Sequence, residues 1–137
     1  MNISKVMTRN VEIARPDDTI QSVAQRMASG DFGFMPVCDG TKIQGVVTDR
    51  DLTIRAVAQS LDGSTPVAQV MSGDLQWRYD DEPAKDVLAC MAKNQIRRLP
   101  IVNRNNELVG VVSLGDLAMQ GKDRAAGEAL ESISRKG

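Results

Sequence analysis

The chain has 137 residues and a formal net charge of −1, so it lacks the basic surplus that a sequence-independent nucleic-acid binder uses to neutralise phosphates. It contains no histidine, which excludes the common catalytic triads and the usual zinc-site layouts. No apolar run approaches about 18 residues and no signal-peptide core opens the chain, so we expect a cytoplasmic protein without a membrane span.

The predicted core is aliphatic, because aromatic residues make up only 3% of the sequence. The two cysteines, Cys38 and Cys90, lie far apart and do not occupy equivalent positions of the repeat described below. Two isolated thiols fit a reducing compartment, and we interpret both as inert packing residues.

An internal repeat divides the chain into two halves. The opening segment Val6-Met7-Thr8 returns as Val70-Met71-Ser72. Later in each half, Gly45–Leu52 returns as Gly110–Leu117, and a length difference of one residue falls in the polar turn before it. Each half alone would bury a marginal core, so we expect the halves to pack together.

The first half begins with a short predicted strand, Val11-Glu12-Ile13, followed by a helix. Asp17-Asp18-Thr19 offers the helix an N-cap, and Gly30 stands where a C-terminal cap belongs. Apolar residues between these points recur at helical spacing and predict one buried stripe. The stripe is Ile20, Val23, Ala24, Met27 and Ala28.

Two strands and a second helix complete the first half. The predicted strands are 34–38 and 43–48, and the helix runs from about Asp49 to Ala58. Pro36 within the first of these strands implies an edge position or the beginning of a strand.

The second half repeats this pattern, so each half is a β-α-β-β-α unit of an α/β (α+β) fold. Its first strand is predicted at Leu75-Gln76-Trp77, and its helix starts near Pro83. The helix stripe is Ala84, Val87, Leu88, Met91 and Ala92. The later elements are strands 99–102 and 108–113 and a helix from about Leu114 to Met119.

The predicted domains follow the sequence. They are a first repeat over 1–60, a polar linker over 61–66, a second repeat over 67–121 and a C-terminal helical tail over 122–137. The tail carries apolar residues at helical spacing, which fits either packing on its own domain or contact with a partner.

Two accounts explain the strand-to-helix turns at Thr48–Asp51 and Ser113–Asp116. Their spacing is that of a capping box, in which the hydroxyl accepts from the third helical amide and the carboxylate reaches back. The same groups could bind a nucleotide, because free amides at a helix start favour phosphate and a carboxylate accepts from vicinal ribose hydroxyls. The upstream Gly45 and Gly110 would let another backbone or a flat ring approach closely.

Taken together, the duplicated β-α-β-β-α order, the Val-Met-Thr/Ser opening and the Gly-x-x-Thr/Ser-x-x-Asp segment resemble tandem CBS domains, or a Bateman module, over about residues 1–120. The resemblance implies two pseudo-symmetric repeats packed together, with AMP, ADP, ATP, NAD or S-adenosylmethionine bound in clefts between them. It also implies a non-catalytic regulatory sensor that commonly forms a homodimer and signals through a conformational or dimer change.

The resemblance also implies site residues. Asp51 and Asp116 would bind ribose hydroxyls, and Thr48 and Ser113 would contact phosphate or ribose. The complete implied set is Val11, Met35, Pro36, Gly45, Thr48, Arg50, Asp51, Leu75, Arg98, Leu99, Pro100, Gly110, Ser113 and Asp116.

The two copies are not equal. Arg50 and Arg98 are candidate phosphate contacts, and a solvated surface arginine is the alternative for Arg50. The second copy has Gly115 at the position of Arg50, so we expect the first copy to take the phosphate if only one does.

Two other functions compete with a nucleotide sensor. One is a structural dimerisation module with degenerate, non-binding clefts. The other is a small enzyme such as a nucleotide hydrolase, against which stand the missing histidine, the missing Gly-x-x-x-x-Gly-Lys-Ser/Thr loop and the lack of a carboxylate cluster for Mg²⁺. No metal, membrane or nucleic acid is expected, and a protein partner is left open.

Overall fold

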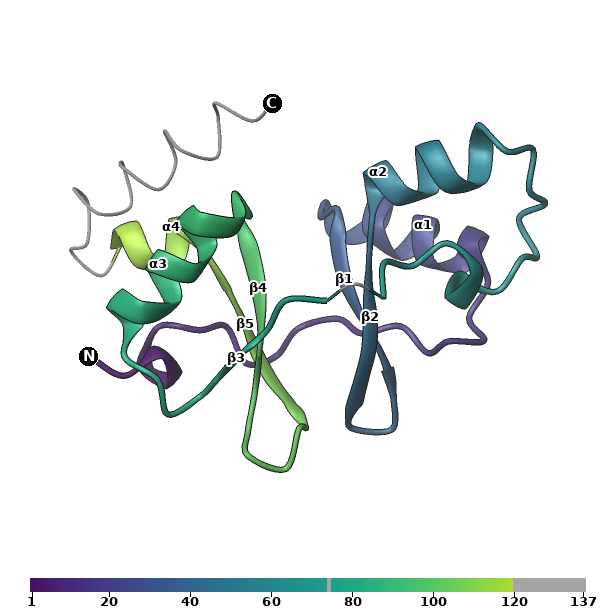
Figure 1. Cartoon of the computed structure of the whole chain (residues 1–137). Helices are drawn as coiled ribbons and strands as arrows, with labels where there is room; N and C mark the ends of the chain where they lie inside the picture. The colour runs from purple at the N-terminus through teal and green to yellow at the C-terminus, as the bar shows by residue number, and fades with distance from the viewer. Residues whose placement is uncertain (74, 120–137) are drawn as a thin grey trace. The chain divides into compact units, whose positions relative to one another are not determined.

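A computed structural model of the chain describes residues 1–73 and 75–119 and shows two compact units (Figure 1). The first unit is Glu12–Leu75, and the second combines Met1–Val11 with Gln76–Gly137. These units do not coincide with the two repeats of the sequence. Each unit is completed by the residues that open the other repeat, 1–11 in one case and 67–75 in the other, and these are called the opening segments below. Within the described residues, no helix is long and apolar enough to cross a membrane. The predicted tail, 122–137, lies outside the described residues.

The first unit packs one helical layer on a two-stranded antiparallel sheet, β1 with β2. Its elements are α1 (Ile20–Gly30), β1 (Phe34–Asp39), β2 (Lys42–Thr48), α2 (Asp49–Asp51), the π-helix η2 (Leu52–Val57) and the 3₁₀ helix η3 (Val67–Gln69). Its buried core takes residues from all parts of the unit, including Val67 and Val70 of the second repeat's opening segment.

The second unit repeats this plan with a three-stranded sheet in the order β3-β4-β5. Its elements are the 3₁₀ helix η1 (Ile3–Lys5), β3 (Arg78–Tyr79), α3 (Ala84–Asn94), β4 (Arg98–Val102), β5 (Leu108–Ser113) and α4 (Leu114–Met119). Ile3, Val6 and Met7 from the chain's beginning belong to its buried core. The mixed α/β architecture is therefore confirmed.

The strands predicted at Val11–Ile13 and Leu75–Trp77 are wrong. The extended backbone first pairs at Ala14, which accepts from the Cys38 N–H and donates to the Pro36 carbonyl, both at 2.8 Å. The equivalent residue of the second half is Arg78, where β3 begins its parallel pairing with β4. Pairing starts later than predicted because β-type residues alone do not fix where a partner strand becomes available.

The helix stripes are confirmed at their large residues but are narrower than predicted in α1. Ile20, Val23 and Met27 are buried, whereas Ala24 and Ala28 are exposed. The C-terminal cap at Gly30 is also wrong: Asp31 adopts the left-handed conformation, with φ 55°. Gly30 is the last helical residue, and the Phe32 ring lies over its Cα, where a Cβ would be 2.3 Å from Cε1.

The opening segments pair with the outer edges of β2 and β5. The N–H of Val46 donates to the Ser72 carbonyl at 3.1 Å, and the Ser72 N–H returns a bond of 2.8 Å. Thr8 and Val111 exchange the same two bonds, each at 2.9 Å. Each repeat therefore extends the sheet of the other repeat's unit at one edge.

The prolines inside β1 and β4 fit this arrangement. Pro36 lies opposite Val46, and Pro100 lies opposite Val111. Because Val46 and Val111 direct both backbone groups to the opening segments, each forms a non-hydrogen-bonded pair with its proline. The missing proline N–H therefore leaves no gap in either hairpin, although Pro100 stands in the middle strand of its sheet.

The glycines before these valines permit the close approach. A Cβ on Gly45 would lie 2.6 Å from the Ser72 carbonyl oxygen, and one on Gly110 would lie 2.8 Å from that of Thr8. The sequence analysis expected either another backbone or a flat ring against these glycines. The structure places another backbone there.

We predict that Gly45→Ala lowers the free energy of unfolding by about 1–3 kcal/mol, the usual cost of overpacking. Its methyl group would force Ser72 away and weaken both bonds to Val46. The matched control is Gly73→Ala, since nothing lies within 4 Å of a Cβ there. Urea unfolding of both variants checks this prediction, and equal stability of the two would contradict it.

Burial raises the pKa of the Cys38 thiol to about 11 from its ordinary value of 9.0, because the thiolate would lose its hydration. The folded state thus holds this proton more tightly than the unfolded chain, so the associated stability is lost as pH rises from about 9 to 11. We predict that this loss, about 2 kcal/mol, is absent in Cys38→Ala and retained in Cys90→Ala. Urea unfolding at pH 8, 9, 10 and 11 measures it.

Candidate functional site

In the first unit, the predicted capping box joins the end of β2 to the start of α2. The Oγ1 of Thr48 accepts from the Asp51 N–H at 3.1 Å, and the Oδ2 of Asp51 accepts from the Thr48 N–H at 2.9 Å. Both reciprocal bonds form because Thr48 is extended, with φ −119° and ψ 165°, while the residues after it are helical. The account based on capping is therefore confirmed at this turn.

The second oxygen of the Asp51 carboxylate faces a cation. Arg55, one helical turn later, holds its Nε 3.7 Å from Oδ1 of Asp51. The side chain of Asp51 is 16% exposed, so part of the carboxylate still reaches solvent. Each carboxylate oxygen has two acceptor positions, so these contacts leave capacity for further donors.

In the second unit, Ser113 and Asp116 form the same reciprocal pair. The Ser113 Oγ accepts from the Asp116 N–H at 3.1 Å, and Oδ2 of Asp116 accepts from the Ser113 N–H at 3.0 Å. The duplicated sequence spacing thus produces the same reciprocal cap in both units.

The two arginine candidates lie at different places relative to these turns. Arg50 is exposed two residues after Thr48, and no described residue pairs with its guanidinium. Arg98 begins β4 directly opposite Ser113 in the register. The corresponding residue opposite Thr48 is Phe34. Each turn therefore has one of the two candidate arginines near it, presented by the helix in one copy and by the neighbouring strand in the other.

The residues proposed to flank adenine offer backbone rather than side chains. Met35 and Leu99 have no exposed area and belong to the two cores, and Pro36 and Pro100 are buried as well. The opening-strand candidates are divided between the units. Val11 belongs to the unit of Ser113, and Leu75 belongs to the unit of Thr48.

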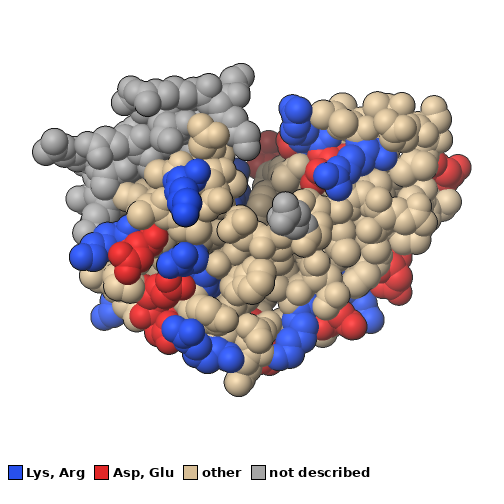
Figure 2. All heavy atoms as spheres, in the orientation of Figure 1, with Lys and Arg blue, Asp and Glu red and all other residues tan. Residues whose placement is uncertain are grey.

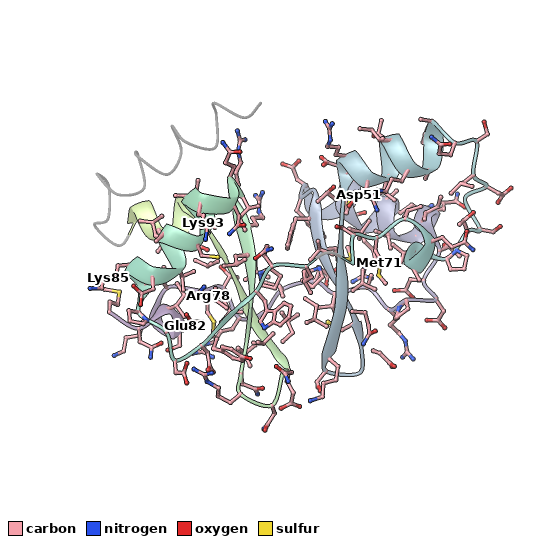
Figure 3. All side chains as sticks on the ribbon, viewed as in Figure 1. Asp51, Met71, Arg78, Glu82, Lys85 and Lys93 are labelled. Carbon is pink, nitrogen blue, oxygen red and sulfur yellow. The ribbon has the colours of Figure 1, made fainter. Side chains whose placement is uncertain are left out.

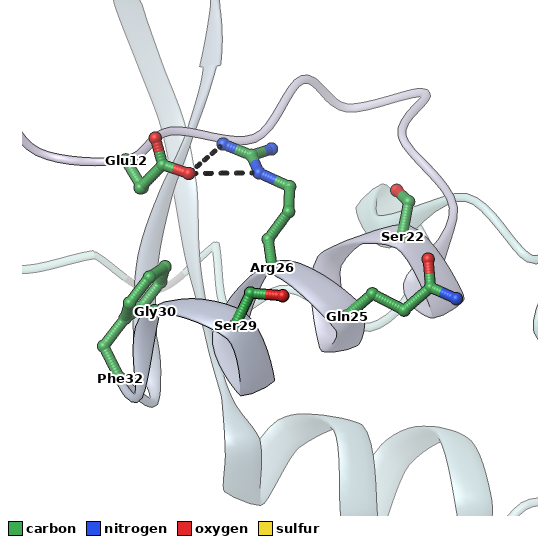
Figure 4. Close-up of a pocket in the computed structure, with 7 residues that line it drawn as sticks. All are labelled: Glu12, Ser22, Gln25, Arg26, Ser29, Gly30 and Phe32. Carbon is green, nitrogen blue, oxygen red and sulfur yellow. Dashed lines mark hydrogen bonds and ion pairs between the residues drawn. The ribbon is translucent and has the colours of Figure 1, made fainter.

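A pocket of about 480 Å³ lies elsewhere in the first unit, along α1 (Figure 4). Its lining residues are Glu12, Ser22, Gln25, Arg26, Ser29, Gly30 and Phe32, and none of them belongs to the predicted site. Arg26 already donates to Glu12 and to the Ile13 carbonyl, and it lies 3.6 Å from Asp18. With its cation satisfied internally, this pocket has no free charge to bind an anion.

Charge elsewhere is mixed. On the face drawn in Figure 2, the described Lys and Arg side chains are interspersed with Asp and Glu. Among the described residues there is no group of three or more cysteines and carboxylates that could hold a metal ion. The two arginines that the sequence analysis named as candidate phosphate contacts, Arg50 and Arg98, both lie at the two turns.

Sequence reasoning missed Arg55. Besides facing Asp51, its Nη1 donates to the Met71 carbonyl at 3.2 Å, so it joins the turn to an opening segment. The spacing of Asp51 and Arg55 is the i, i+4 spacing of a helical ion pair, and this signal could have identified the first contact. The contact with Met71 depends on the exchange of opening segments.

Comparison with known proteins identifies both halves. A family model described as "CBS domain" matches residues 3–57 and 67–121. The "CBS domain-containing protein YhcV" of Bacillus subtilis (strain 168) is 43% identical over 136 residues, which cover 98% of this chain and 96% of the relative.

Two solved structures share the fold. The crystal structure of CBSX2 in complex with AMP matches with a TM-score of 0.78 and 19% identity, covering 90% of this chain and 97% of that one. The CBS domain pair of protein MJ0100, in complex with 5′-methylthioadenosine and S-adenosylmethionine, matches with a TM-score of 0.77 and 21% identity, covering 90% and 98%.

The capping box predicts a measurable contribution to stability. Thr48→Ala removes the hydroxyl that accepts from the Asp51 N–H and should cost about 1 kcal/mol of the free energy of unfolding. Thr48→Ser keeps that acceptor and should lose much less. Urea denaturation compares the two, and an equal loss in both variants would show that the methyl group, not the cap, matters.

Proposed function

Since the chain belongs to the CBS domain family, which its two matched halves and its relative show, we propose that it is a non-catalytic regulatory module that binds adenosyl ligands. The ligand class is AMP, ADP, ATP, NAD or S-adenosylmethionine, all of which present an adenosine. Two proteins of the same fold were solved with such molecules, AMP in one case and 5′-methylthioadenosine and S-adenosylmethionine in the other.

The observation that carries this proposal is the pair of equal turns. Each presents one carboxylate, held in place by its own helix cap and still able to accept more hydrogen bonds. Two vicinal hydroxyls of a ribose match one carboxylate, so Asp51 and Asp116 are the proposed ribose contacts. The hydroxyls of Thr48 and Ser113 are each occupied by the cap as acceptors, which leaves their protons to donate.

We assign the phosphate of a nucleotide to the turn of the first unit. Arg50 is exposed there and makes no ion pair with a described residue, so its charge is available to an anion. An arginine at the start of a helix is opposed by the dipole, and a bound phosphate would remove that disadvantage.

A second candidate is a structural dimerisation module. The π-helix η2 and the residues after it expose Ile54, Val57 and Leu61 at 44%, 75% and 36%, an apolar stripe that a second protein surface could cover. This candidate predicts that no adenosyl compound binds and that substitutions at Asp51 and Asp116 cost only the stability of a cap.

The test is calorimetric titration of the whole chain with AMP, ATP, NAD and S-adenosylmethionine. Asp51→Asn keeps the shape of the side chain but leaves one acceptor oxygen, so we expect affinity at that turn to fall about tenfold or more, as for lost bonds to charged groups. Asp116→Asn should affect the second turn in the same way. The matched control is Asp39→Asn, an exposed aspartate at the end of β1.

The titration separates the two candidates. Binding that Asp51→Asn or Asp116→Asn weakens and Asp39→Asn leaves unchanged supports the sensor. If none of the four compounds binds, the dimerisation module replaces it. Hydrolysis of ATP in proportion to protein concentration, and lost in Asp51→Asn, would overturn the non-catalytic role.

A further inference from the structure

We propose that Arg55 couples the ribose contact to an opening segment, so that ligand binding at Asp51 tightens residues 67–73; this inference rests on the proposed function. Arg55 is a positioning residue in this scheme, because it acts through Asp51. Its guanidinium spans two acceptors at once, with Nε 3.7 Å from Oδ1 of Asp51 and Nη1 donating to the Met71 carbonyl at 3.2 Å. In Figure 3, Asp51 and Met71 lie on neighbouring segments of the first unit.

The first contact orients the carboxylate. One oxygen of Asp51 is held by the Thr48 N–H, and the other faces Arg55. A planar guanidinium can keep two directed contacts in a fixed geometry, whereas an ammonium acts as a point charge. A ligand that adds hydroxyl donors to Asp51 needs this same orientation, so it favours the conformation in which Arg55 is in place.

The second contact reaches Met71, near the end of the opening segment. The start of that segment is already anchored, because Val67 and Val70 are buried in the core of the first unit. Beside the bond from Arg55, the opening segment is joined to β2 by the two bonds between Val46 and Ser72. The Ser72 carbonyl lies close against Gly45, so a small shift of the segment would displace the backbone of β2. The chain then continues through Leu75 into the second unit, so this segment leads to one of the two covalent links between the units, the other being Val11–Glu12.

The coupling belongs to one copy. In the sequence, the residue equivalent to Arg55 in the second half is Gln120, which lies outside the described residues. Glutamine carries no charge, so it cannot form the ion pair with Asp116. A response that depends on Arg55 is therefore expected from the first turn alone.

The consequence is a reciprocal linkage between two sites. If AMP binds more tightly when Arg55 bridges Asp51 and Met71, then bound AMP must stabilise that bridge by the same factor. The opening segment would be held more firmly in the complex, and its backbone amides would exchange with solvent more slowly.

The experiment follows amide hydrogen exchange of Val46 and Ser72 in the whole chain, with and without AMP, alongside calorimetric affinity. In the wild-type protein, AMP should slow both amides. Arg55→Met keeps the aliphatic stem, removes the bridge, and should speed exchange of both amides in the ligand-free protein. Its AMP affinity should fall by about fivefold or more, the lower range of allosteric coupling, and AMP should leave the two amides unchanged.

Two further variants separate the bridge from simple charge. Arg55→Lys keeps the positive charge beside Asp51 but cannot hold both acceptors in the same way. It should therefore lose the response of Val46 and Ser72 to AMP and, by reciprocal linkage, the same fivefold or more of AMP affinity as Arg55→Met. It also serves if Arg55→Met fails to fold. Arg15→Met is the matched control, because Arg15 is an exposed arginine of the same unit paired loosely with Asp17.

The outcomes are distinct. An AMP response of Val46 and Ser72 that survives in Arg55→Lys and Arg55→Met overturns the coupling. AMP binding without any response in the wild-type protein overturns the coupling and leaves the proposed function intact. If AMP does not bind the wild-type protein, the coupling is overturned, and AMP is also removed from the proposed ligands.

Discussion

The structure depends on one backbone constraint that occurs twice. In each unit, a valine near the end of a strand turns both its N–H and its C=O toward an opening segment of the other repeat. Three sequence features follow from it. The preceding residue must be glycine, because the opening segment leaves no room for a Cβ. The residue opposite can be proline, because the hairpin does not use its N–H there. The strand also gains neighbours on both sides shortly before it ends.

This constraint prepares the turn that follows. With β2 paired to β1 on one edge and to Ser72 on the other, Thr48 leaves the strand at a defined position and direction. The capping box then orients the carboxylate of Asp51 through bonds within the chain itself. Preorganisation of this kind lowers the cost of binding, because the polar groups are already ordered.

Most of the regular structure could be predicted from the sequence. The helix faces at Val23, Met27, Val87 and Met91, the hairpins and both capping boxes depend on local spacing, which a sequence displays directly. The start of pairing at Ala14 and Arg78 could not be predicted, because it depends on where a distant strand lies. The positive φ at Asp31 could not be predicted either, because it depends on packing. Gly30, the residue expected to adopt it, instead makes room for the Phe32 ring.

The site was predictable to the same extent. Thr48, Asp51, Ser113 and Asp116 are neighbours in sequence and form their pairs as spacing indicated. Arg98 was named as a candidate phosphate contact, but its place opposite Ser113 depends on the strand register, which only the structure shows. The contact of Arg55 with Met71 required knowledge that the opening segments are exchanged, and no local pattern encodes that exchange.

The exchange also separates the order of synthesis from the order of assembly. When the first repeat has emerged from the ribosome, the first unit is still incomplete. Val67 and Val70, which belong to its core, have yet to be made. That unit becomes complete soon after residue 75 emerges. Ile3, Val6 and Met7, although made before the first unit, must wait until β5 has been made before they reach their places in the other core. These apolar side chains thus stay without their native partners while nearly all of both repeats is translated.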